Sequence, residues 1–218
     1  MKTDELVGAV QKGDSAGVAA LLDEDRLLLT AKSGNVSGIL LALYHGHPEI
    51  AQLFIERGSQ LTFAEACAIG DRRRAIELLD ADPSLLQSYS EDGFPCAALS
   101  VFFRHPELAR ELFERGADVN AQARNPQRVG AVHAAATVGD RETMRLLLDR
   151  GADPNARQQV GFTPLHSAAN RGDIEMAKLL LQYRADPHAR TDDGKDAIDI
   201  AQKQDQSAFV EWFRANVK

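Results

Sequence analysis

Two cysteines and six histidines are the side chains that could carry chemistry here, and Cys96 with His133 is the most suggestive pair. Cys96 stands at the start of a predicted helix, where the partial positive charge of the helix end lowers a thiol pKa. His133 follows in the next sequence block and could act as a base. A nucleophile also needs an orienting group and an oxyanion site, and no motif supplies either. We therefore expect no enzymatic activity, with thiol chemistry at Cys96 as the enzymatic alternative.

The other histidines and Cys67 lack the spacing of a metal site. His45 and His47 flank a glycine, His105 stands alone, and no acid or thiol lies at ligand spacing from any of them. The two cysteines share no spacing with other thiols, so we expect neither a disulfide framework nor a zinc site. The sequence predicts no metal and no cofactor.

Three stretches of the chain, 92–120, 130–155 and 161–188, are copies of one another. Moving back 33 residues places His166 on His133, Gly172 on Gly139, and the leucine run 179–181 on 146–148. A fixed period of this length is typical of stacked helix pairs, which bind through an extended surface.

Each copy contains the signals for two helices. Thr163 is predicted as an N-cap whose hydroxyl accepts from an early backbone N–H, and Pro164 takes the first helical position, where no donor is needed. Asp173 is predicted to cap the second helix, which has an apolar stripe and ends at Tyr183. Gly116 and Gly151 suit a left-handed turn after that helix, but Arg184 stands in the same place and would be strained there.

The block Thr163-Pro164-Leu165-His166, the later Gly172, the paired leucines and the Gly151-Ala152-Asp153 turn resemble the ankyrin repeat. This resemblance implies an all-α solenoid of helix-turn-helix units with short β-hairpin fingers. It also implies that His133 and His166 bond neighbouring backbone and tie adjacent fingers together. The sequence then divides into about seven units within one domain, with caps at 1–31 and 193–217 around repeats at 34–60, 61–91, 92–127, 128–159 and 160–192.

Spacing between units predicts two irregular fingers. Gly46 and its counterpart Gly70 are too close for a full finger between them, so one finger is expected to be missing there. The interval from Arg104 to Gly139 is longer than the period, and its extra residues fall around Pro126. Such insertions commonly lengthen fingertips on the binding side.

The resemblance implies that residues near the end of each first helix line a concave groove that binds another protein. These residues change from aromatic and apolar in the early units to polar in the last, as in a binding centre with a polar edge. Packing of the aromatic side chains between helices is an equal alternative. The candidate groove residues are Tyr44, His45, Ile69, Phe102, Phe103, Thr137, Val138, Asn170 and Arg171.

The fingertips form a second candidate surface with Tyr89, Arg124, Arg128 and Gln158. The two arginines could meet an acidic patch or a phosphate, although arginines on loops are commonly only solvated. Binding through groove and fingers could serve a scaffold, or it could inhibit or regulate a partner by masking its active site.

Composition and charge restrict the partner class. The chain of 218 residues is 44% hydrophobic and 26% charged, and no apolar run could span a bilayer, so no membrane association is expected. The formal net charge of −7 disfavours nucleic acid and slightly favours a basic protein surface as partner. The acidic start of the chain does not resemble a secretory signal. We expect a cytoplasmic protein, with the monomer favoured over an oligomer.

Overall fold

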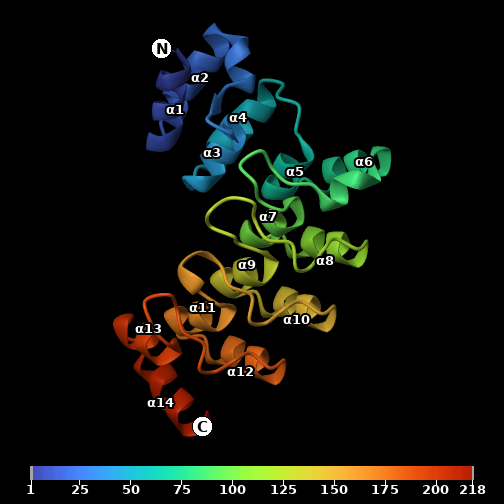
Figure 1. Ribbon diagram of the computed structural model, residues 1–218. Helices are drawn as coiled ribbons and strands as arrows, with labels where there is room; N and C mark the ends of the chain where they lie inside the picture. Colours follow the sequence, from blue (N-terminus) through green and yellow to red (C-terminus); the bar gives the residue numbers. More distant parts are fainter. Residues whose placement is uncertain (1, 218) are drawn as a thin grey trace. The chain divides into compact units, whose positions relative to one another are not determined.

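The computed structural model describes residues 2–217, which form fourteen α-helices, three 3-10 helices and two short strands (Figure 1). The predicted fold class, a predominantly helical ankyrin-type repeat architecture, is confirmed. Within the described residues the chain divides into two compact units. The N-terminal unit contains residues 2–85 and 90–92, and the C-terminal unit contains 86–89 and 93–217.

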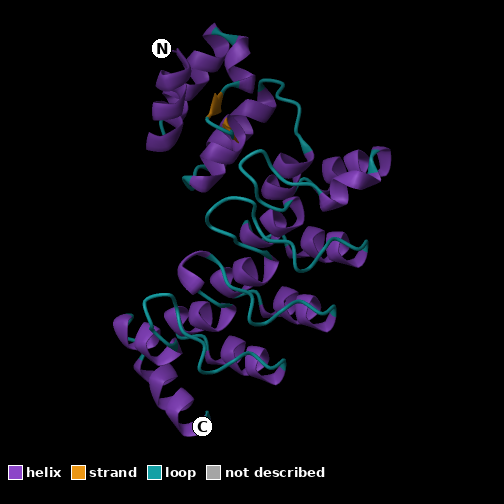
Figure 2. Ribbon diagram, viewed as in Figure 1, coloured by secondary structure: helices purple, strands orange, loops and turns teal. Residues whose placement is uncertain are grey.

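The N-terminal unit contains three helix pairs and the only two strands among residues 2–217 (Figure 2). Strands β1 and β2 pair antiparallel, with Lys32 opposite Ser37 and Ser33 opposite Val36. The elements are α1 (Lys2–Lys12), α2 (Ser15–Glu24), η1 (Arg26–Thr30), β1 (Lys32–Ser33), β2 (Val36–Ser37), α3 (Gly38–Tyr44), α4 (Pro48–Glu56), α5 (Phe63–Ile69) and α6 (Arg72–Ala81). The 3-10 helix η2 (Pro83–Gln87) follows α6 along the chain.

The C-terminal unit contains four helix pairs in two layers. Helices α7, α9, α11 and α13 pack one against the next in the inner layer, and α8, α10 and α12 follow one another in the outer layer (Figure 1). The elements are α7 (Cys96–Phe102), α8 (Pro106–Glu114), α9 (Ala131–Val138), α10 (Arg141–Asp149), η3 (Gln159–Gly161), α11 (Pro164–Arg171), α12 (Ile174–Gln182), α13 (Ala197–Lys203) and α14 (Ser207–Asn216).

A Gly-Asp pair makes the turn between the two helices of several units. At Gly172 the backbone has φ +68°, which glycine adopts without side-chain strain, and α11 ends there. Asp173 then caps α12 by accepting from the Met176 N–H, as predicted. The same arrangement occurs at Gly139 and Asp140 before α10, and at 70–71 before α6.

The interior of each unit follows from the small residues of the inner helices. Ala134, Ala135 and Ala136 on α9 are at most 1% exposed, so neighbouring inner helices can approach closely. Cys67 on α5 is completely buried and serves as a small core residue. The outer helices contribute larger side chains such as Leu147, also fully buried. Truncating such a leucine to alanine costs about 2–5 kcal/mol.

The predicted missing finger is confirmed. After α4 the chain reaches α5 through residues 57–62, which contain no strand and end in a capping box. There Thr62 Oγ1 accepts from the Glu65 N–H and the Glu65 carboxylate accepts from the Thr62 N–H. The fingers of the C-terminal unit are irregular loops closed by isolated bridges, Tyr89 with Pro95 and Gln122 with Gly130.

Two helix ends in the C-terminal unit have unusual local geometry. Thr163 stands at the N-cap of α11, but its hydroxyl lies 2.9 Å from Nδ1 of His166 and does not accept from a backbone N–H as predicted. Because Nδ1 already accepts from the Thr163 N–H, it is an acceptor, and the Thr163 hydroxyl donates to it. Arg184 keeps the left-handed turn, with φ +67°, so this non-glycine residue is strained.

Candidate protein-interaction surface

His133 has a structural role. Its ring is completely buried, Nδ1 accepts from the Gly130 N–H at 3.0 Å, and Nε2 donates to the Ala156 carbonyl oxygen at 2.8 Å. Because Nδ1 is an acceptor, the neutral ring carries its proton on Nε2. Burial lowers the pKa of His133, and the Ala156 carbonyl opposes only part of that effect. This histidine ties its finger to the next, as the repeat resemblance implies.

His166 makes only one of the two corresponding hydrogen bonds to backbone. Nδ1 accepts from the Thr163 N–H at 3.1 Å, but Nε2 is buried without a hydrogen-bond partner among residues 2–217. Burial lowers the pKa of His166, and the nearby carbonyls of Lys195 and Ala189 partly oppose this shift without reaching bonding geometry. Both histidines are therefore neutral near pH 7.

The pair that could have supported thiol chemistry is not arranged for it. Cys96 begins α7 as predicted, but it is only 1% exposed and its Sγ lies 3.3 Å from the Ser88 hydroxyl. Both ring nitrogens of His133 are occupied by backbone groups, so this histidine cannot serve as a base without breaking a tie between fingers. The described part of the chain contains no group of three or more potential metal ligands.

The candidate groove residues of the C-terminal unit lie at the ends of its inner helices. Phe102 is 42% exposed and meets Phe103 edge to face, with ring centres 5.2 Å apart. Thr137, Asn170 and Arg171 are exposed, whereas Val138 is buried and adds nothing to this surface. The remaining residues of α9, 131–136, are also buried. In α7, α9 and α11, exposed side chains are thus confined to the helix ends.

Arg171 also has a structural contact. Its Nη1 donates to the Thr137 carbonyl at 3.0 Å, which caps the end of α9. A side chain on Gly139 would meet the same guanidinium, since a Cβ there would lie 2.9 Å from Nη2. The arginine therefore joins two units while its side chain remains exposed.

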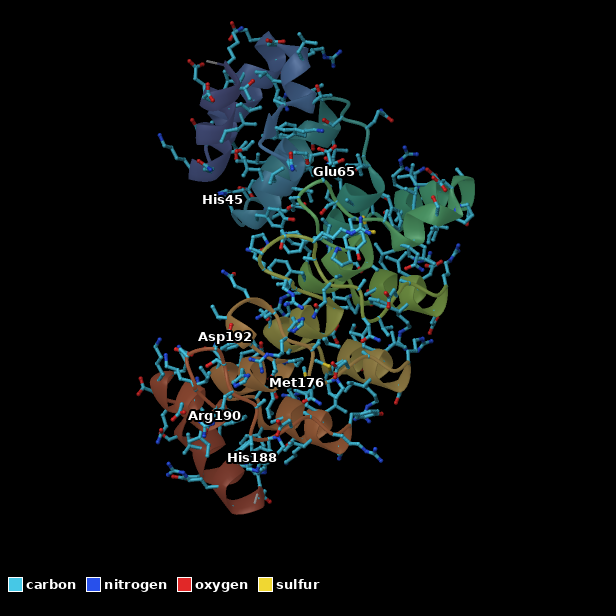
Figure 3. The ribbon with its side chains drawn as sticks, in the orientation of Figure 1. His45, Glu65, Met176, His188, Arg190 and Asp192 are labelled. Carbon is cyan, nitrogen blue, oxygen red and sulfur yellow. The ribbon has the colours of Figure 1, made fainter. Side chains whose placement is uncertain are left out.

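The three candidates in the N-terminal unit differ in exposure. The Tyr44 hydroxyl donates to Asp92 Oδ2 at 2.8 Å, and its ring is half-buried, as is Ile69. His45 is exposed at the end of α3 (Figure 3). Tyr44 thus has a packing and hydrogen-bonding role inside its unit, which is the alternative that the sequence left open.

The fingers of the C-terminal unit bring several predicted residues together. The guanidinium of Arg124 lies 3.7 Å from the centre of the Tyr89 ring, a close cation–π contact. Arg128 has a left-handed backbone, φ +54°, and its Nη2 donates to Gln122 Oε1 at 3.3 Å. Arg124 and Arg128 are exposed, and Gln158 is half-buried at the start of the next finger.

Backbone hydrogen bonds join adjacent fingers. The Arg124 N–H donates to Gly93 O at 2.8 Å, and the Gln159 N–H donates to Gln127 O at 2.9 Å. The Asp192 N–H then donates to Val160 O at 3.0 Å. Fingers that are joined in this way present their tips as a continuous surface.

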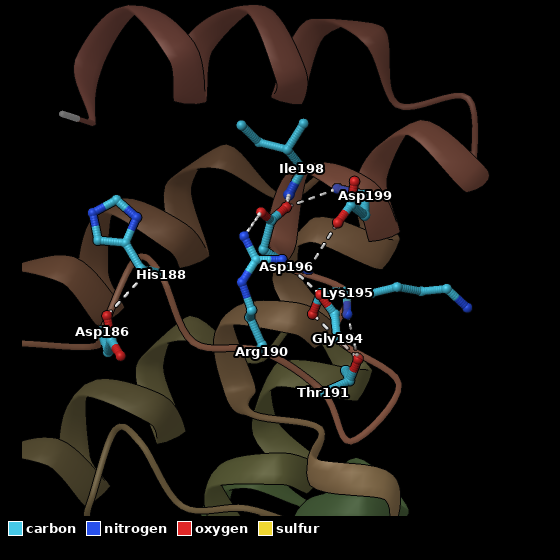
Figure 4. A network of polar contacts seen from close by, with 9 residues as sticks. All are labelled: Asp186, His188, Arg190, Thr191, Gly194, Lys195, Asp196, Ile198 and Asp199. Carbon is cyan, nitrogen blue, oxygen red and sulfur yellow. Dashed lines mark hydrogen bonds and ion pairs between the residues drawn. The ribbon is translucent and has the colours of Figure 1, made fainter.

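The last finger is fixed by its own ion pairs (Figure 4). Arg190 donates to Gly194 O at 2.6 Å and to Asp196 Oδ2 at 3.3 Å. Arg157 of the preceding finger donates to Arg190 O and to Asp192 Oδ1. Figure 3 labels Arg190 and Asp192 in this region. These arginines are committed to partners within the chain.

Sequence reasoning missed three features. Gln87, Asn120 and Asn155 each use a side-chain amide to bond the turn of the next unit, and their regular spacing was a visible signal. Val160 is 59% exposed with φ +57°, which only the structure could reveal. The predicted binding residues also omit Arg157, although it lies one repeat period of 33 residues after Arg124.

Comparison with known proteins agrees with this architecture. The family model for ankyrin repeats, in three copies, matches residues 132–217. An ankyrin repeat-containing protein of Treponema pallidum is 41% identical over 73 residues, which are 34% of this chain and 24% of that protein. The E3 ubiquitin-protein ligase KEG of Arabidopsis thaliana is 36% identical over 100 residues, 46% of this chain and 6% of the ligase.

A third relative, the fem-1 homolog A-like protein of Mus musculus, is 32% identical over 99 residues, 45% of this chain and 13% of that protein. In each case the match spans a quarter or less of the relative's length. Helices among residues 2–217 are all too short or too polar to cross a membrane. The repeated helix pairs, the Gly-Asp turns and the matched segment agree, and the predicted ankyrin repeats are confirmed over residues 132–217.

Proposed function

We propose that this chain is a non-enzymatic module that binds another protein through its inner-helix ends and its fingertips. Ankyrin repeats are protein-interaction modules in general. The observation that carries the proposal is Phe102, a large apolar side chain 42% exposed at the end of an inner helix whose other residues are buried. Exposed aromatic side chains on a rigid element are typical binding anchors.

The mechanism is preorganisation. Phe102 is held edge to face against Phe103, and Arg124 is held against Tyr89, so their positions are set before a partner arrives. Little ordering entropy is then lost on binding. We propose further that the chain acts in the cytoplasm as a monomer. The cap at 1–31, the cap at 193–217 and the five repeats between them would form one binding domain.

Affinity capture from native lysate tests the proposal, with the parent chain compared with Phe102→Ser. We expect the bound protein to be lost or at least about tenfold depleted, because an apolar anchor contributes on the order of 1.4 kcal/mol or more. Leu27→Ser is the matched control, since Leu27 is 81% exposed in the N-terminal unit and outside the proposed site. Equal capture by parent and Phe102→Ser would reject the helix-end site.

The same experiment separates two roles. If the captured protein is an enzyme, its activity can be assayed with and without this chain. Inhibition that Phe102→Ser abolishes would indicate that the chain masks an active site, and unchanged activity would indicate a scaffold.

A further inference from the structure

The excess negative charge of this protein is confined to one part of the chain. The N-terminal unit has 15 acidic and 8 basic residues, while the C-terminal unit has 17 of each, so the net charges are −7 and 0. The net charge of the whole chain therefore does not describe the surface of the C-terminal unit. The expectation of a basic partner rested on that total.

Within the C-terminal unit the charges are segregated. Segments 93–106, 119–139 and 154–172 contain the inner helices α7, α9 and α11 and the second and third fingers, and they carry five arginines and no aspartate or glutamate. The first finger, closed by the bridge from Tyr89 to Pro95, also contains Glu91 and Asp92. The acids of residues 93–190 lie on the outer helices, their caps and the following turns. The second and third fingers therefore present a cationic surface on an electrically balanced unit.

Two of these arginines are available for an outside partner. Among residues 2–217, neither Arg124 nor Arg128 pairs with a carboxylate; one stacks on Tyr89 and the other bonds the Gln122 amide. Arg157 differs, because it pairs with Asp192 at 3.1 Å. Stacking fixes the guanidinium of Arg124 and leaves its edge available for a carboxylate, which accepts two parallel hydrogen bonds from such a group.

An exposed apolar side chain lies on the adjoining finger. The hydrogen bond from the Gln159 N–H to Gln127 O joins the two fingers, and Arg128 and Val160 are the residues that follow its two ends. Val160 is 59% exposed and left-handed, although a β-branched side chain is strained in that conformation and glycine would fit better. Glycine at this position would relieve the backbone strain and expose less apolar surface, so the valine improves neither local stability nor solubility.

We propose that Tyr89, Arg124, Arg128 and Val160, the finger patch, bind an acidic segment of another protein that carries an aliphatic residue. Carboxylates of that segment contact the two arginines, and its aliphatic residue packs on Val160. The pair of Arg157 and Asp192 bounds the patch on the far side of Gly161, because a Cβ on Gly161 would collide with both side chains. The inference rests on the proposed function and adds the chemistry of the partner.

The geometry favours a protein segment over a nucleic acid. The finger patch offers only two guanidinium groups, those of Arg124 and Arg128, and the exposed Val160 lies on the adjoining finger. A polyphosphate chain gains affinity from many basic contacts, and the strongly acidic N-terminal unit belongs to the same molecule. A short segment with both carboxylates and an aliphatic residue matches both kinds of contact.

Selection from a random linear peptide library displayed on phage tests the proposal, with the full chain as bait. We expect the selected peptides to be rich in aspartate and glutamate and to contain an aliphatic residue. Synthetic copies should bind roughly tenfold or more weakly to Arg124→Ser/Arg128→Ser and weaken as salt is added. The control Arg110→Ser/Arg145→Ser removes the same charge from exposed positions of α8 and α10, and it should bind like the parent.

Val160→Gly separates a binding role from a structural one. This change should raise the midpoint of thermal unfolding or leave it unchanged, because the strain is relieved, while peptide affinity falls several-fold. A fall in both the unfolding midpoint and the peptide affinity would mean that Val160 stabilises the finger and does not contact the partner.

Several results would overturn the inference. The first is the selection of neutral or basic peptides, and the second is acidic peptides that bind the Arg124→Ser/Arg128→Ser variant as tightly as the parent. The third is heparin binding at these arginines without peptide binding. If peptide binding depends on Phe102 instead, the finger patch is wrong and the proposed function stands. If neither peptides nor lysate yield a partner, both are wrong.

Discussion

The side chain of Asn120 bonds the backbone of Asp153, 33 residues further along the chain. Its Oδ1 accepts from the Asp153 N–H at 2.8 Å, and its Nδ2 donates to Gly151 O at 3.1 Å. Asn155 repeats both bonds one unit later, with Asp186 and Arg184. One side chain thus serves both a donor and an acceptor of the neighbouring turn, which holds consecutive units in register.

Asn120→Ala should lower the free energy of unfolding by about 1–2 kcal/mol. Two hydrogen bonds are lost, each contributing about 0.5–1.5 kcal/mol, but the backbone groups are near the surface and water replaces part of the loss. Urea denaturation followed by circular dichroism measures the change. Asn170→Ala is the control, because Asn170 is exposed and makes no side-chain hydrogen bond within residues 2–217. Equal stability of the two variants would show that the amide bonds are not structural.

Stability should fall as the pH drops below about 6.5. Burial lowers the pKa of His133 and His166, so the unfolded chain takes up protons at a pH where the folded chain does not. The stabilisation is fully present above the unfolded pKa and is lost as the pH falls toward the folded pKa, by up to about 1.4 kcal/mol per pH unit for each histidine. Thermal unfolding between pH 7.5 and about pH 5 measures this loss.

His133→Asn supplies the control for the pH effect. The variant is less stable at pH 7.5, since it cannot repeat both backbone bonds, but its stability should depend less steeply on pH than that of the parent. An equal slope in the two proteins would assign the pH dependence to other groups.

The repeat architecture could be predicted because its signals are local. Gly172 and Asp173 are adjacent in the sequence, and together they determine where one helix ends and the next begins. The same is true of the missing finger, since the number of residues between Gly46 and Gly70 limits what the chain can form there.

The candidate surface could be predicted only in part, because exposure depends on packing with neighbouring units. Thr137 and Val138 are adjacent in the sequence, yet one is exposed and the other buried. The stacking of Arg124 on Tyr89 joins residues 35 positions apart, and nothing in either local sequence indicates it. The strain at Val160 is likewise a property of the folded finger.

Replacing Arg184 with glycine should stabilise the protein by about 0.5–1 kcal/mol. A left-handed conformation costs an L-residue about 1–2 kcal/mol, and glycine returns part of that gain through the greater entropy of the unfolded chain. The bond from Asn155 Nδ2 to the Arg184 carbonyl is kept, because it uses only the backbone. Chemical denaturation measures the difference. Gly151→Arg is the reciprocal change at the matching turn, where φ is +84°, and it should destabilise the protein. A loss of stability in Arg184→Gly would mean that the arginine side chain offsets its own backbone strain.

The thiol of Cys96 should be nearly inert in the folded protein. The side chain is 1% exposed at the first turn of α7, so an alkylating reagent reaches it only after local opening. In a Cys67→Ala background, which leaves a single thiol, we expect alkylation near neutral pH to be at least about a hundredfold slower than in denaturant. The denatured chain is the internal control for reagent and pH. Rapid alkylation of the folded chain would contradict this expectation and return thiol chemistry at Cys96 to consideration. His133→Asn would then show whether the imidazole is involved, because a purely structural histidine changes the alkylation rate only through stability.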